Sequence, residues 1–198
     1  MTWSATARYR LESAPGGLGL VQDLLNTVSA GAPPHPDLLD DEADARNWVD
    51  QAVAEWAAVT GRQAPQTALD AEGLRELRAV REGLLRATSR AARGEAKDPP
   101  REPVPEHSAG AALRLCEDGV VRLEPRGSGL RHLVALLLAE VYEGQRADTA
   151  RRLKPCRNPL CRVTFFDRSR NNSGVWHDVK TCGNAANLRA YRARQRER

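Results

Sequence analysis

Residues 156–161 read Cys156-Arg157-Asn158-Pro159-Leu160-Cys161, and residues 177–182 read His177-Asp178-Val179-Lys180-Thr181-Cys182. Each segment has a soft-metal ligand at both ends and four residues between them. Structural zinc sites use four thiolate or imidazole ligands in a tetrahedron, and two ligands on one tight turn make half of such a site. Asn158-Pro159 favours that turn. We therefore expect Cys156, Cys161, His177 and Cys182 to bind one structural Zn²⁺ ion.

Two other interpretations of these residues stay open. The cysteines could be scattered buried thiols beside a surface histidine, or Cys156 and Cys161 could form a disulfide. The density of ligands and the scarcity of apolar residues around them favour the metal. The remaining cysteine, Cys116, is expected to be a packed thiol.

We expect no enzymatic activity from this centre. A hydrolytic zinc keeps an open coordination position, whereas four protein ligands fill all of them. The nearest carboxylates, Asp167 and Asp178, are expected to pair with neighbouring arginines. The rest of the chain has no nucleophile–base arrangement, glycine-rich phosphate loop or suggestively paired carboxylates.

The ligands lie in a short C-terminal module that we assign to residues 149–198. A segment of about 45 residues is too short to bury a self-sufficient core, so a metal would act as its staple. We expect a strand over Val163–Phe166, a turn over Asn171–Gly174 and a helix from Asn184 to about Glu197. Leu188 should face the zinc core.

Charge is divided unequally along the chain. Residues 151–198 contain 13 Lys/Arg and 3 Asp/Glu, a net charge of +10, whereas residues 1–150 carry −6. Such a division favours a nucleic-acid partner for the basic end. Guanidinium groups bind phosphate well. The expected contacts are Arg189, Arg192, Arg194 and Arg196 on the helix, with Arg168 and Arg170 on a second edge.

DNA is the expected partner, and RNA is the alternative. RNA readers stack bases on aromatic side chains, and the module offers Phe165, Phe166, Trp176 and Tyr191. At least two of these are expected in the core, which favours DNA. A solvated basic tail without a partner is the remaining interpretation.

The first 148 residues predict a second, mainly helical domain. A strand is expected over Trp3–Leu11, and helices over Leu18–Ser29, from Asp40–Asp44 to near Gly61, within Thr67–Arg93, and after Ser128. A proline-rich loop covers Asp98–Gly110, and Asp118-Gly119 predicts a hairpin within Leu113–Leu123. The apolar helix after Ser128 should be the central buried one. The fold class is thus α+β, mainly α.

Residues Leu153–Arg194 resemble the CGNR zinc-finger family. The resemblance rests on Cys156-x4-Cys161, Phe165-Phe166-Asp167-x-Ser169-Arg170-Asn171, Trp176 and Cys182-Gly183-Asn184. Val21-Gln22-Asp23-Leu24-Leu25-Asn26-Thr27 resembles the early signature of ABATE, the helical domain that precedes this finger in the family. The resemblance implies a bacterial DNA-binding transcriptional regulator that responds to stress.

The sequence departs from the family pattern at two positions. His177 stands where the family commonly has a cysteine, and histidine is an acceptable zinc ligand. Ala185 replaces the arginine of the family motif, so that any contact of that arginine must come from Arg189 or be absent.

In a regulator the N-terminal domain would sense a ligand or form a homodimer, because a single finger binds weakly. Asp23, Asn26 and Thr27 could line a pocket for a small molecule, but capping of backbone groups is the favoured interpretation. No apolar run reaches 18 residues and the N-terminus lacks a signal peptide, so we expect a cytoplasmic protein with no membrane partner.

Overall fold

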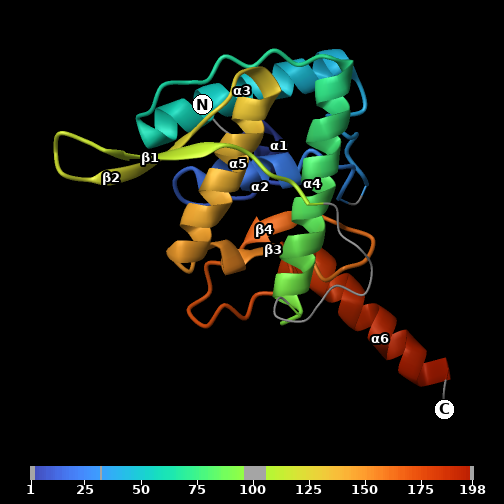
Figure 1. Ribbon diagram of the computed structural model, residues 1–198. Helices are drawn as coiled ribbons and strands as arrows, with labels where there is room; N and C mark the ends of the chain where they lie inside the picture. The colour runs from blue at the N-terminus through green and yellow to red at the C-terminus, as the bar shows by residue number, and fades with distance from the viewer. Residues whose placement is uncertain (1–2, 32, 96–105, 197–198) are drawn as a thin grey trace.

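The computed structural model describes residues 3–31, 33–95 and 106–196. Its fold is α+β and mainly α, as predicted, with two small antiparallel hairpins (Figure 1). Residues 98–105 of the predicted proline-rich loop lie outside the described part.

A bundle of helices forms the body. It consists of α1 (Ser4–Ala7), α2 (Leu18–Leu25), α3 (Glu42–Thr60), α4 (Ala71–Ala92) and α5 (Gly129–Arg146). Every residue of α2 is buried, and α5 contributes the fully buried Leu133, Leu136 and Leu137, so both helices lie at the centre. The expectation that the helix after Ser128 is central is thereby confirmed.

Local capping explains the bounds of the long helices. The Asp41 carboxylate accepts hydrogen bonds from the backbone N–H groups of Ala43 and Asp44 and starts α3. Gly61, in the left-handed conformation, ends it. The Asp70 carboxylate accepts from the N–H of Gly73 and starts α4. Both helix starts and the end of α3 match their predictions because these signals are local.

Two predictions for the N-terminal segment are wrong. Residues 4–7 form helix α1 instead of a strand, because the buried carboxylate of Asp23 accepts a 2.7 Å hydrogen bond from the N–H of Thr6. Helix α2 ends at Leu25 instead of Ser29. There, Arg8 donates from its guanidinium to the carbonyls of Asn26, Thr27 and Val28. Both differences arise from contacts distant in sequence.

The predicted hairpin is confirmed as β1 (Ala111–Leu115) paired antiparallel with β2 (Val121–Pro125), with Gly119 at φ 76° in the turn. It projects from the body next to α5 (Figure 1).

The C-terminal module begins with a 3₁₀ turn, η1 (Ala150–Arg152), followed by β3 (Leu153–Pro155) and β4 (Thr164–Phe166), which pair antiparallel. A π-helical turn, η2 (Val179–Gly183), leads into α6 (Asn184–Arg196). Strand β3 lies against α4 and β4 against α2. Helix α6 extends away from the body in Figure 1. Among the described residues, no helix has the length and apolarity needed to cross a membrane.

Candidate metal centre

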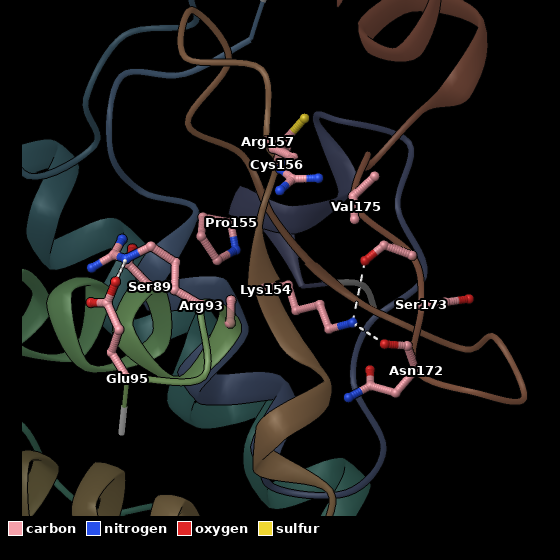
Figure 2. A pocket seen from close by; sticks show the side chains of 12 residues that line it. Ser89, Arg93, Glu95, Lys154, Pro155, Cys156, Arg157, Asn172, Ser173 and Val175 are labelled. Atoms are coloured by element: carbon pink, nitrogen blue, oxygen red, sulfur yellow. Dashed lines mark hydrogen bonds and ion pairs between the residues drawn. The ribbon is translucent and has the colours of Figure 1, made fainter. Parts of the chain in front are cut away.

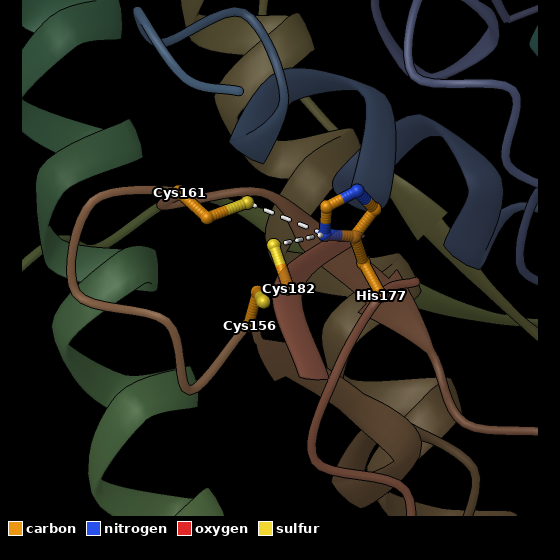
Figure 3. A group of neighbouring side chains, drawn as sticks. All are labelled: Cys156, Cys161, His177 and Cys182. Atoms are coloured by element: carbon orange, nitrogen blue, oxygen red, sulfur yellow. Dashed lines mark hydrogen bonds between the residues drawn. The ribbon is translucent and has the colours of Figure 1, made fainter. Parts of the chain in front are cut away.

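The four predicted ligands converge on one point (Figure 3). The Sγ atoms of Cys156, Cys161 and Cys182 and a ring nitrogen of His177 all lie within 4.8 Å of one another. The Nδ1 atom of His177 is 3.2 Å from the Sγ of Cys161 and 3.6 Å from that of Cys182. A tetrahedral zinc with ordinary bond lengths separates its sulfur and nitrogen ligands by about 3.6 Å. The cluster is therefore positioned to bind one zinc ion, and the Cys156–Cys161 disulfide is excluded because both thiols are free.

Local backbone hydrogen bonds orient the ligands. Cys156 follows β3, where its N–H donates to the carbonyl of Val163, and the N–H of Cys161 donates to the carbonyl of Asn158 to close the knuckle. Cys182 lies in η2, which Asp178 caps by accepting from the N–H groups of residues 180 and 181. Asp178 thus binds backbone instead of the arginine expected for it.

Asn158 forms hydrogen bonds that hold a metal ligand in place. The sequence indicated only that Asn158 favours the turn between Cys156 and Cys161. It is 4% exposed, and its Nδ2 donates to the Sγ of Cys182 at 3.3 Å. Its Oδ1 accepts from the guanidinium of Arg189 on α6 at 2.8 Å. Hydrogen bonds of this kind orient ligands and stabilise thiolate charge. Asn158 therefore connects the metal centre directly to the basic helix.

The thiols interact strongly before any metal binds. A hydrogen bond between the two thiols lowers the pKa of Cys156 and raises the pKa of Cys161. This donor set fits a soft divalent cation, since Zn²⁺ binds thiolates and displaces the remaining protons.

Residues from the N-terminal part of the chain cover the centre. Val28 and Ala30 are buried in one apolar cluster with the cysteines and Val163, and Tyr9 packs against it. The N–H of Gly31 donates to the carbonyl of Cys161 at 2.7 Å. Gly31 has φ +95°, and a side chain there would approach the Tyr9 ring to 3.2 Å, so the close contact favours glycine.

A second connection holds strand β4. The Asn26 amide pairs with the Thr164 peptide in both directions, accepting from its N–H and donating to its carbonyl, each at 2.9 Å. Asn26 is fully buried, and its side chain acts as a strand partner for the module. The segment predicted as 149–198 is thus packed on the first 148 residues, while that boundary stays a prediction.

The motif around Asp167 closes the loop between β4 and the histidine. Asp167 is 3% exposed and accepts from Lys154 Nζ at 2.8 Å and from the N–H groups of Ser169 and Gly174. Burial alone would raise the pKa of this carboxyl, but the hydrogen bonds outweigh it and lower the pKa to about 2. Lys154 also donates to the carbonyls of Asn172 and Gly174 (Figure 2). The partner of Asp167 is therefore a lysine, not the predicted arginine.

The arginines predicted to contact nucleic acid differ in whether their side chains already have partners within the described protein. Arg192, Arg194 and Arg196 are exposed on α6, and among the described residues none of their side chains forms a hydrogen bond or ion pair. Arg170 is likewise exposed and unpaired within that part. Arg189 is bound to Asn158.

Arg168 lies over the Phe166 ring, pairs with Glu12 at 2.8 Å and donates to the carbonyl of Ser13. Leu188 is 49% exposed, so the expectation that it faces the zinc core is wrong. Helix α6 directs its leucine outward because the core of the module is filled by the cysteines and the cover from the N-terminal part.

Asp23, Asn26 and Thr27 come together under α1 and all three are fully buried. Asp23 accepts from the N–H of Thr6 and from Trp48 Nε1, and burial raises its pKa. The Thr27 hydroxyl donates to the carbonyl of Leu24 and accepts from Arg81. Each polar group therefore has a partner inside the protein, and the ligand pocket suggested for them stays a prediction.

A family model for the CGNR zinc finger matches residues 152–195, which include all four ligands, Asn158 and most of α6. No curated protein matches the chain.

Proposed function

We propose that this chain is a zinc-dependent DNA-binding protein, a transcriptional regulator in which helix α6 contacts the DNA backbone. The observation that carries the proposal is the position of α6 relative to the metal. The helix begins two residues after the ligand Cys182, is tied back to the centre through Arg189 and Asn158, and projects from the body with Arg192, Arg194 and Arg196 exposed. Metal binding would thereby give a basic helix a fixed direction.

The charge on α6 supports phosphate contact. The helix contains four arginines and no acidic residue within Asn184–Arg196. Phosphate contacts supply most of the affinity of such proteins and little of the specificity. The centre has a structural role in this proposal, because its four ligands leave no position for a substrate.

Burial of the aromatic residues favours DNA over RNA. Phe165 is 7% exposed, and Trp176 is partly buried against the metal cluster. Phe166 is covered by Arg168, which leaves Tyr191, at 55% exposure, as the free aromatic side chain of the described module. A single aromatic ring is a poor platform for stacking successive bases.

The test is metal content combined with binding of random duplex DNA at several salt concentrations. We compare the native chain with Cys161→Ser, which removes a fully buried ligand, and with Cys116→Ser, which removes the free thiol of the hairpin. We expect one zinc per native chain and per Cys116→Ser chain, and loss of both metal and DNA affinity in Cys161→Ser.

Zinc without DNA binding even at low salt would contradict the DNA assignment, and tighter binding of single-stranded RNA of random sequence would establish the alternative. A native chain that contains no metal after purification and zinc addition would contradict the whole proposal.

A further inference from the structure

A cavity of about 380 Å³ lies on the side of the body formed by α1, the following loop and α3. Its wall includes Trp3, which precedes α1, Ala7 of α1, Leu11 of the loop, and Arg168 from the C-terminal module. That volume is in the lower part of the range for small-molecule sites. Apolar surface from Trp3, Ala7 and Leu11 gives it room for a hydrocarbon portion of a ligand.

Glu55 of α3 lines this cavity and is the unusual group in it. The residue is 8% exposed, and its Oε2 is buried with no hydrogen-bond partner among the described residues. The other strongly buried carboxylates of the body have donors. Asp23 receives Trp48 Nε1 and the N–H of Thr6, and Glu140 receives Trp56 Nε1 at 2.9 Å. A buried carboxylate without a donor destabilises the fold unless something else supplies one.

Among the described residues, the one positively charged side chain that lines the cavity, Arg168, does not bind Glu55. Arg168 pairs with Glu12 and donates to the carbonyl of Ser13, so its guanidinium is used at the rim. Glu12, Glu55 and Arg168 together leave the lining with one negative charge in excess. A ligand that completes the site must therefore bring a positive charge and hydrogen-bond donors.

A bare metal ion fits these observations poorly. Calcium and magnesium take six or more oxygen ligands. Among the described residues, the one group of three or more metal-ligating side chains is the cysteine–histidine cluster, which lacks Glu55 and Glu12. An ammonium group needs fewer partners, since it donates three hydrogen bonds and tolerates an apolar wall around its carbon chain.

We propose that this cavity is a binding site for a small organic amine, with the ammonium group donating to Glu55 and the carbon chain lying against Trp3 and Leu11. The site does not depend on nucleic-acid binding, and it differs from the group of Asp23, Asn26 and Thr27, whose polar atoms have partners inside the protein.

The test uses n-butylamine as the probe and n-butanol as its uncharged analogue, both titrated at pH 7 into the zinc-loaded full chain. Nuclear magnetic resonance follows the indole N–H of Trp3 and the amide of Ala7. We expect saturable shifts with n-butylamine and a dissociation constant on the order of 1 mM, as is usual for a ligand of this size. n-Butanol should bind at least about tenfold more weakly.

Two variants make the result specific. Glu55→Gln keeps the shape of the side chain and removes the charge, and should weaken n-butylamine binding by about tenfold or more. Glu76→Gln, an exposed position on α4, is the matched control and should bind as the native chain does. Without ligand, Glu55→Gln should unfold at the same or a higher temperature, because it removes an unpartnered buried charge.

Equal binding of n-butanol would overturn the assignment of an amine site, as would unchanged n-butylamine binding in Glu55→Gln. No saturable shift at about tenfold above the expected constant would do the same. A lower unfolding temperature of Glu55→Gln would mean that the carboxylate has a structural partner, and would also overturn the proposal.

Discussion

Asn158 connects two parts of the molecule through one amide group. Its nitrogen donates to the sulfur of Cys182 and its oxygen accepts from Arg189, so that the orientation of α6 and the position of the Cys182 sulfur depend on the same side chain. The position of Arg189 one turn beyond Ala185 explains how an arginine reaches the knuckle even though position 185 has none.

Asn158→Ala should therefore weaken zinc binding while leaving all four ligands in place. Loss of a supporting hydrogen bond to a ligand typically lowers metal affinity by about 10- to 100-fold. Competition with a chromophoric chelator measures the change, and Asn187→Ala, at an exposed position of α6, is the control. Unchanged affinity in Asn158→Ala would show that the bond to Cys182 contributes nothing.

Asp167 and Lys154 form the other important pair at this scale, because Asp167 is buried, Lys154 is largely covered, and each satisfies backbone groups of the same loop. Gly174 belongs to this arrangement, since a side chain there would lie 2.7 Å from the carboxylate. Asp167→Asn leaves the largely covered ammonium of Lys154 without its counterion, and should destabilise the fold by about 3 kcal/mol at neutral pH.

The pH dependence of that effect has a definite sign. The folded-state pKa of Asp167 is about 2, below the ordinary value of 3.8, so the ionised carboxyl stabilises the fold above pH 4. About 2 kcal/mol of this stabilisation is lost as the pH falls from 4 toward 2. Denaturant unfolding of the native chain and Asp167→Asn should show a difference that shrinks over this window, whereas a constant difference would contradict it.

At the scale of elements, α6 differs in its surroundings from α4, the other arginine-rich helix. Arginines of α4 have partners within the body. Arg86 forms an ion pair with Glu82, and Arg78 donates a hydrogen bond to the Leu39 carbonyl. Helix α6 has no acidic residue to neutralise its charge. Counterion release should therefore be concentrated on this helix.

Replacing Arg192 and Arg196 with glutamine should reduce affinity for random duplex DNA and make its dependence on salt less steep. Each lost phosphate contact lowers the magnitude of the slope of log K against log salt by about 0.9. The double variant is thus expected to lose about 2 from that slope, and Arg75→Gln with Arg86→Gln on α4 should lose none. Equal losses in both variants would assign the effect to net charge instead of to α6.

On the scale of the whole molecule, the metal centre and the helical body share one packed region. Val28 and Ala30 cover the cysteines, Gly31 binds the Cys161 carbonyl, and Asn26 completes β4. The polar residues of the segment Asp23-Leu24-Leu25-Asn26-Thr27 therefore have a structural role, because they hold α1, β4 and Arg81 in place.

A fragment of residues 149–198 should bind zinc at least about tenfold more weakly than the full chain, because it lacks this cover and must order itself at the expense of binding energy. Chelator competition on both proteins measures the difference. Equal affinities would mean that the module folds alone, and would support the predicted boundary at residue 149 as a boundary between independent units.

The sequence alone determined those features whose causes lie close together along the chain. Ligand spacing predicted the metal centre, Asp41, Gly61 and Asp70 set the bounds of α3 and α4, and the Asp-Gly pair predicted the hairpin. Such signals depend on a few neighbouring residues, and the tertiary contacts do not change the local structure that they favour.

Only the tertiary structure decided the rest, because it depends on contacts between distant residues. Residues 4–7 form a helix above Asp23, α2 ends where Arg8 and Thr164 bind it, and Lys154 rather than an arginine pairs with Asp167. The carboxylate of Glu55 is buried without a partner among the described residues because α1 and Arg168, which are distant from it in sequence, form walls of the same cavity. Burial and pairing of polar groups are properties of the packed chain, and a local pattern does not contain them.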